Sequence, residues 1–149
     1  MNNDFLDMLS TLSEEGAEYL LVGAYALAVH GLPRATGDLD IWIRTTPENR
    51  RRVWRALERF GTPLHELEEE DLSADDLVFQ IGLAPQRIDI LTSIDGVDFE
   101  EAWPERFETA VAGQPVPVIS REHLARNKRA SGRPQDLADL AWLEKGKSE

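Results

Sequence analysis

Apolar residues along the chain occur partly at helical spacing and partly in short continuous runs, which predicts a mixture of helices and strands. Residues 4–14 have helical spacing, with Phe5, Leu9 and Leu12 on one stripe before Gly16 ends the segment. Further helices are expected at 24–31, 46–60 and from 120 to the end of the chain, interrupted at 131–134. Strands are expected at 18–23, 39–43, 77–83 and 87–93, and as a hairpin-like pair over 108–120, with a helical or irregular connection at 99–107.

Local signals mark several of these boundaries. Thr46 and Pro47 are typical of a helix cap followed by its first residue, and Ser120 is a cap of the same kind. The chain has no repeats, low-complexity tracts or linkers. We therefore expect a single α/β (α+β) domain over 1–149, in which helices, including a C-terminal pair, flank a mixed or antiparallel sheet.

Composition narrows the possible chemistry. The 149 residues are 42% hydrophobic, enough for one core, and no stretch approaches the roughly 20 apolar residues of a membrane span. The N-terminal residues lack the pattern of a secretory signal, so a soluble, cytoplasmic protein without a membrane partner is expected. Cysteine is absent and the three histidines are scattered. Any metal ligands should then be carboxylates, which suit Mg²⁺ or Mn²⁺.

The charge is strongly acidic overall but uneven along the chain. A net charge of −12 disfavours non-specific binding of nucleic acid. Basic residues nevertheless gather at 44–59 and 121–133, with an acidic segment at 65–76 between them. We interpret the arginine-rich helix at 50–59 as a solvated face. The alternative is that these arginines guide an RNA or another phosphate-bearing substrate to the protein.

Two aspartates stand at the start of an apolar strand. Side chains alternate along a strand, so Asp38 and Asp40 should project from one face while Leu39 and Ile41 enter the core. Asp89 repeats the arrangement in the strand at 87–93. If the two strands are neighbours, three carboxylates converge, and a divalent cation would offset their mutual repulsion. Taken alone, the Asp-x-Asp pair is more typical of a turn with solvated ends than of a metal site, because so short a motif also occurs by chance.

The wider context resembles the nucleotidyltransferase superfamily, which shares its fold with DNA polymerase beta. In YLLVGAYALAVHGLPRATGDLDIWI, a strand ends in a glycine, a helix begins at once, and the Asp-x-Asp opens the next strand. Backbone N–H groups at such a glycine turn can hold a triphosphate. Gly23 matches the first glycine of the family motif, whereas Ala24 stands where the family has Gly or Ser, so a hydroxyl contact to phosphate is missing.

The C-terminal region extends the resemblance. REHLARNKRASGRPQDLADLAWL is similar to small bacterial nucleotidyltransferase-like proteins related to abortive-infection and toxin-antitoxin systems. Lys128, Arg133, Asp136 and Asp139 match their Lys followed by Arg-x-x-Asp-x-x-Asp. The resemblance implies that Lys128 reaches the nucleotide's phosphates and that Asp136 orients Lys128 or an incoming hydroxyl. We expect a structural role for Asp139.

Other residues near the Asp-x-Asp have two interpretations each. Arg34 and Thr36 could contact phosphate or metal-bound water, or could pair with a nearby acid and cap a turn. Trp42 shares the face of the aspartates and could stack on a base, although packing is the commoner role of a strand tryptophan.

The resemblance implies two alternative functions. The first is an enzyme that transfers a nucleoside monophosphate from a nucleoside triphosphate, for example ATP, to a hydroxyl of a protein side chain, a tRNA end or a small molecule. Asp38, Asp40 and Asp89 would hold Mg²⁺ or Mn²⁺, and Asp89 would be the base. The second is a catalytically inactive relative that acts as an antitoxin or partner subunit. Ala24 and the short chain favour the second, and retention of all three carboxylates favours the first.

Overall fold

A six-stranded mixed sheet forms the centre of the molecule. The computed structural model describes residues 1–32, 37–65, 67–83 and 86–147. The sheet has the strand order β3-β4-β2-β1-β6-β5. Its strands are β1 (Tyr19–Val22), β2 (Leu39–Ile43), β3 (Val78–Ile81), β4 (Ile88–Leu91), β5 (Phe107–Val111) and β6 (Gln114–Val118). The pairs β2–β4 and β1–β6 are parallel, and the other three pairs are antiparallel. The expectation of a mixed sheet is confirmed.

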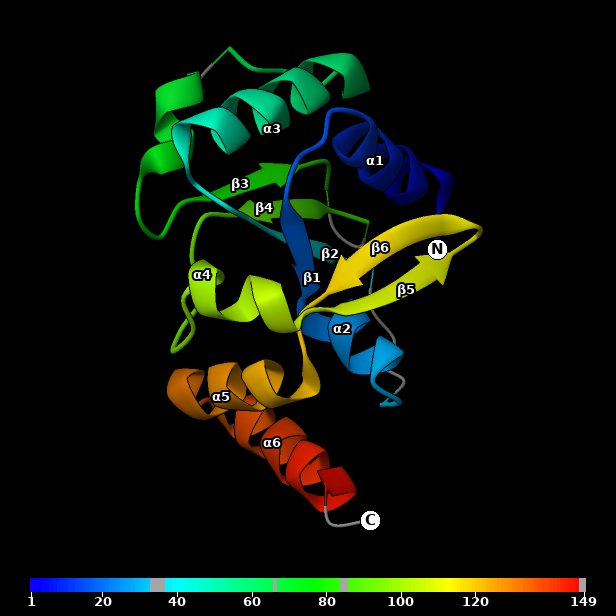
Figure 1. The fold of residues 1–149 in the computed structure, drawn as a ribbon, viewed down its shortest axis with the longest axis vertical. Helices are drawn as coiled ribbons and strands as arrows, with labels where there is room; N and C mark the ends of the chain where they lie inside the picture. The colour runs from blue at the N-terminus through cyan, green and yellow to red at the C-terminus, as the bar shows by residue number, and fades with distance from the viewer. Residues whose placement is uncertain (33–36, 66, 84–85, 148–149) are drawn as a thin grey trace.

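Helices cover both faces of this sheet (Figure 1). On one side α1 (Asn3–Glu14) and α3 (Pro47–Phe60) pack against each other. On the other side lie α4 (Phe99–Ala102), the 3-10 segment η2 (Trp103–Glu105), α5 (Arg121–Ser131) and α6 (Pro134–Lys147). The remaining elements are α2 (Gly23–Val29), which follows β1 directly, and the 3-10 segment η1 (Glu69–Ser73). None of the described helices is long and apolar enough to cross a bilayer.

The helix starts follow the capping signals in the sequence. The Thr46 hydroxyl accepts the Asn49 backbone N–H at 3.4 Å, and the Ser120 hydroxyl accepts that of His123 at 3.1 Å. The Asn2 side chain caps α1 in the same way, although no sequence signal was assigned to it. These bonds satisfy N–H groups that have no partner within the helix, so they fix where each helix begins.

Trp42 belongs to the core rather than to a binding surface. Its side chain is 1% exposed, and its ring lies edge-on to Phe99 of α4 with centroids 5.0 Å apart. The hypothesis that Trp42 stacks on a base is therefore wrong. Burial of both aromatic rings instead fixes α4 against the face of the sheet that carries Asp40.

Candidate active site

The parallel pair β2–β4 brings the acidic residues together. Asp40 and Asp89 are register partners, so they lie side by side on adjacent strands, as the sequence predicted if the strands were neighbours. Asp38 precedes β2, and its Oδ1 accepts the backbone N–H of Arg87 at 3.3 Å. The side chains of these acids alternate with buried Leu39 and Ile88, so the strands place the acids on one face because the opposite face enters the core.

Arg87 bridges two of the three carboxylates. Its Nε donates to Asp89 Oδ1 at 2.7 Å and its Nη2 to Asp89 Oδ2 at 3.1 Å, a two-pronged pairing. The same Nη2 lies 3.3 Å from Asp38 Oδ2. Asp89 is only 7% exposed, so this cation offsets a charge that is largely removed from water. Sequence reasoning assigned no role to Arg87, although its place two residues before Asp89 on the same strand face was a usable signal.

Asp40 is the acid of this cluster whose pKa is raised. Burial, the charges of Asp89 and Asp38, and a hydrogen bond with Asp89 raise the pKa of Asp40 to about 6, and the nearby Arg87 opposes that shift. The three carboxylates thus lie near one cation, Arg87. Within the described residues, no three His, Cys, Asp or Glu side chains are arranged as a ready-made metal site.

Gly23 lies against Asp40 at the turn from β1 into α2. Its φ of 67° is in the left-handed region, and a Cβ there would lie 2.2 Å from Asp40 Oδ2. Only glycine allows the backbone to approach the carboxylate this closely. Ala24 follows as the second residue of α2, without a hydroxyl at that position.

A second charged cluster joins α5 to α6. Lys128 Nζ lies 3.2 Å from Asp136 Oδ1 and 3.3 Å from Asp139 Oδ2, and Arg133 Nε donates to Asp136 Oδ2 at 2.7 Å. Lys128 is 8% exposed, and both aspartates are 1% exposed. Burial alone would raise the pKa of Asp136, but hydrogen bonds from Arg133, Ser131 and Lys128 outweigh burial and hold it well below its usual range. Asp139 thus ties Lys128 to α6, a structural contact.

One cleft separates the two clusters. It has a volume of about 480 Å³, and one wall is formed by Val22, Gly23 and Asp40. The opposite wall carries Asn127, Lys128, Ser131, Arg133 and Asp136. The rest of the lining comes from Val78 of β3 and from Leu91, Ser93, Ile94 and Asp95. Arg34 and Thr36, the other expected nucleotide contacts, lie outside the described residues.

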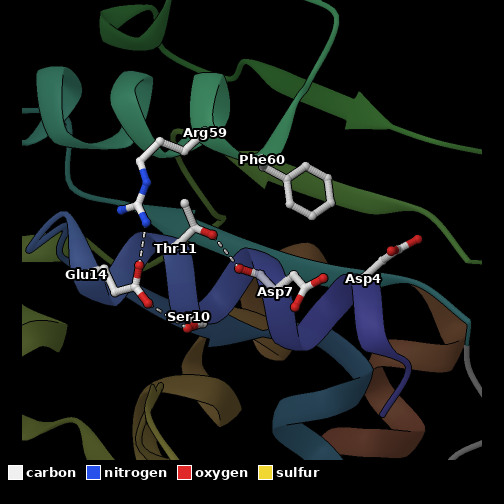
Figure 2. Close-up of a pocket in the computed structure, with 7 residues that line it drawn as sticks. All are labelled: Asp4, Asp7, Ser10, Thr11, Glu14, Arg59 and Phe60. Carbon is white, nitrogen blue, oxygen red and sulfur yellow. Dashed lines mark hydrogen bonds and ion pairs between the residues drawn. The ribbon is translucent and has the colours of Figure 1, made fainter.

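A separate pocket between α1 and α3 has different chemistry (Figure 2). Its volume is about 500 Å³, and its lining is mostly polar, with Asp4, Asp7 and Glu14 among the residues. Three of the polar groups are linked: Glu14 forms an ion pair with Arg59, and Ser10 donates to Glu14. None of its lining residues belongs to the cleft beside Asp40. We therefore place the candidate active site in the cleft.

Comparison with solved structures identifies related folds. A protein from Thermotoga maritima assigned as a nucleotidyltransferase superposes with a TM-score of 0.65 at 17% identity, covering 95% of this chain and 91% of that one. The fold is nucleotidyltransferase-like. The antibiotic-resistance factor ANT(2″)-Ia matches with a TM-score of 0.62 at 16% identity, over 96% and 82% of the two chains. The lincosamide antibiotic adenylyltransferase LnuA, solved with lincomycin bound, gives 0.59 at 18% identity, over 97% and 96%.

Comparison at the level of sequence gives no match. Neither a family model nor a curated protein matches this chain. At identities of 16–18%, the structural neighbours establish the fold and leave the activity of this chain to be argued from its own residues.

Proposed function

We propose that the protein is a metal-dependent nucleotidyltransferase that moves a nucleoside monophosphate from a nucleoside triphosphate to a hydroxyl group. One observation carries this proposal: Asp40 lies against the Gly23 turn in the same cleft as Lys128 and Arg133, and Asp38 and Asp89 gather beside Asp40. An acidic cluster behind Asp40 on one wall, with Lys128 and Arg133 on the other, suits a triphosphate carried with a divalent cation.

The acidic cluster fits Mg²⁺ or Mn²⁺ on its donor chemistry and on its need for a cation. All three groups are carboxylates, the ligands that such ions prefer. The Arg87 guanidinium lies between two of them, which shows that the cluster accommodates a positive charge. A bound divalent cation would stabilise the triphosphate charge and lower the pKa of the acceptor hydroxyl. Asp38 and Asp40 would hold the cation that carries the nucleotide, and Asp89 would share the cation on the acceptor side.

The chain's residues would divide the remaining tasks. The Gly23 backbone and the cations of the opposite wall, Lys128 and Arg133, would hold the phosphates in line for attack. The acceptor oxygen forms a bond to the α-phosphorus while the bond from that phosphorus to the bridging oxygen breaks and pyrophosphate leaves. Asp89 takes the acceptor's proton. Asp136, held by Lys128 and Arg133, keeps both cations in place.

Two structural neighbours favour ATP and a small-molecule acceptor as the first substrates to test. One neighbour is LnuA, an adenylyltransferase with bound lincomycin, and another structure holds ANT(2″)-Ia with adenylyl-2″-tobramycin. A protein side chain and a tRNA end are the other acceptors that the fold family implies.

The alternative is a non-catalytic partner protein, for example the antitoxin of a toxin-antitoxin pair. Two observations favour it. Ala24 supplies no hydroxyl to phosphate, and Arg87 neutralises part of the acidic cluster without a metal. In that case the cleft would bind a nucleotide without turning it over.

A transfer assay separates the two functions. The protein is incubated with ATP labelled at the α-phosphate, Mg²⁺ and acceptors that include aminoglycosides, lincosamides, tRNA and total protein. We expect label on one acceptor class and a loss of roughly 100-fold or more in Asp89→Asn, with binding of ATP largely retained. Asp7→Asn, which removes an exposed acid in the pocket of Figure 2, is the matched control. Transfer that survives Asp89→Asn would contradict the mechanism, and ATP binding without transfer to any acceptor would favour the partner protein.

A further inference from the structure

Arg87 occupies the carboxylate oxygens that a metal would need. Its guanidinium contacts both oxygens of Asp89 and one oxygen of Asp38, and its backbone N–H donates a hydrogen bond to the other Asp38 oxygen. A divalent cation that coordinates Asp38 and Asp89 would lie beside the guanidinium, so the two like charges would compete for these carboxylates. An arginine cannot solve the conflict by losing its proton, because guanidinium stays charged at all ordinary pH values.

The position of Arg87 allows its side chain to move away from the carboxylates. Its side chain is 26% exposed, compared with 9% for the side chain of Asp89. The residue lies just before β4, so its side chain can rotate outward without breaking the strand ladder that begins at Ile88. Removal of the guanidinium without a replacement cation would leave three carboxylates in repulsion, which makes exchange of one cation for another the favourable route.

We propose that Arg87 is a resident counter-ion that competes with the divalent cation for Asp38 and Asp89. This positioning role rests on the proposed metal-dependent function. Without metal, Arg87 holds the acidic residues in place. With metal, it is released from these carboxylates toward solvent, and the phosphates of a triphosphate can supply new partners for its charge. The consequence is that metal binds weakly on its own and more tightly together with the nucleotide.

Direct measurement of Mn²⁺ affinity tests this competition without an enzyme assay. Titrations followed by electron paramagnetic resonance compare wild type, Arg87→Met and Arg87→Lys in the absence of nucleotide. Because a positive charge is removed within a few Å of the cation, we expect Mn²⁺ to bind at least about tenfold more tightly to Arg87→Met. Arg87→Lys keeps the charge but loses the two-pronged contact and should lie between. Arg126→Met, which breaks an exposed pair with Glu101, should leave affinity unchanged.

The outcomes distinguish this role from the proposed function. Equal or weaker Mn²⁺ binding by Arg87→Met would overturn the competition while leaving the metal site intact. Absence of Mn²⁺ binding in wild type and variant, even with ATP present, would overturn the metal-dependent function and this inference together. Should Arg87→Met fail to fold, the wild type alone suffices. The NMR signal of the Arg87 Nε–H, identified by its loss in Arg87→Lys, should shift on addition of Mg²⁺ with ATP, and an unchanged signal at saturation would contradict the release.

Discussion

At the residue scale, the approach of Gly23 to Asp40 links backbone conformation to the chemistry of the cleft. Two separate constraints act on this glycine: its positive φ, and the 2.2 Å that would separate a Cβ from Asp40 Oδ2. The first constraint concerns stability alone, because a side chain in the left-handed region costs about 1–2 kcal/mol wherever it occurs. The second concerns function, since the carboxylate would have to move.

A pair of alanine substitutions separates these constraints. Gly61 ends α3 with a φ of 88°, and a Cβ there would meet nothing within 4 Å. We expect Gly61→Ala to lower the free energy of unfolding by about 1–2 kcal/mol and to keep Mn²⁺-ATP binding. Gly23→Ala should lose more stability than this and should bind Mn²⁺-ATP at least about tenfold more weakly, because Asp40 is displaced. Urea unfolding and calorimetric titration measure both quantities. Unchanged binding in Gly23→Ala would show that the position of Asp40 does not matter for the ligand.

At the element scale, the ion pairs between α5 and α6 decide how firmly the second wall of the cleft is held. Lys128 and its two aspartates are almost fully buried, whereas the pair of Arg129 with Glu144 joins the same helices at the surface. Removal of one partner from a buried cluster leaves an uncompensated charge, but an exposed pair contributes little.

The contrast gives a prediction with a built-in control. Asp136→Asn should lower the free energy of unfolding at pH 7 by about 3–5 kcal/mol, because Lys128 loses a buried partner. Glu144→Gln should change it by less than about 1 kcal/mol. The depressed pKa of Asp136 gives stability that is present above its unfolded-state pKa of about 4 and is lost as pH falls toward the lower folded-state pKa. The gap between wild type and Asp136→Asn should therefore narrow below about pH 4. A gap that stays constant with pH would rule out an ionic origin.

The sequence predicted these elements well where the signals are local. Caps such as Thr46 and Ser120 mark helix starts through bonds to residues three positions away, so they are visible in a short stretch of sequence. The strand order is different, because the parallel pairing of β1 with β6 joins segments far apart in the chain. The buried side chain of Asn49 illustrates the same limit: it bonds to the backbone N–H and carbonyl of Glu18, 31 residues away. No local pattern indicates such a contact.

In the candidate site, too, local patterns were predictable and long-range contacts were not. Alternation along strands placed Asp38, Asp40 and Asp89 on one face, and the structure brings these residues together through the β2–β4 pairing. The pairing of Arg87 with Asp89 could have been predicted from their spacing of two residues along a strand, but the second contact of Arg87 could not. Its pairing with Asp38 depends on a contact 49 residues apart in the sequence, made only when β4 docks beside β2.

At the scale of the whole molecule, the cleft lies between two structural parts. The sheet with the β1–α2 turn supplies Asp40 and Gly23, and the helices α5 and α6 with the link between them supply Lys128 and Arg133. Figure 1 shows these two parts of the fold. A ligand that contacts only one part leaves the other free to open locally, whereas a ligand that contacts both resists opening of either. Mg²⁺ with a triphosphate is the ligand that both walls would recognise, since the acids at one wall suit the metal and Lys128 and Arg133 at the other suit the phosphates.

Hydrogen exchange followed by mass spectrometry can show whether the ligand joins the two parts. With Mg²⁺ and ATP together, we expect slower exchange at the β1–α2 turn around Gly23 and, at the same time, in α5 around Lys128. Either component alone should give much less protection, because ATP without the cation is repelled by the carboxylates and the cation alone competes with Arg87. Helices α1 and α3 lie on the other side of the sheet, so their exchange should slow less than that of either wall and serves as the internal reference. Protection confined to α5 and α6, with no change at the turn, would mean that the nucleotide binds to the cationic wall without engaging the acidic residues, and the cleft would then lack the geometry that transfer requires.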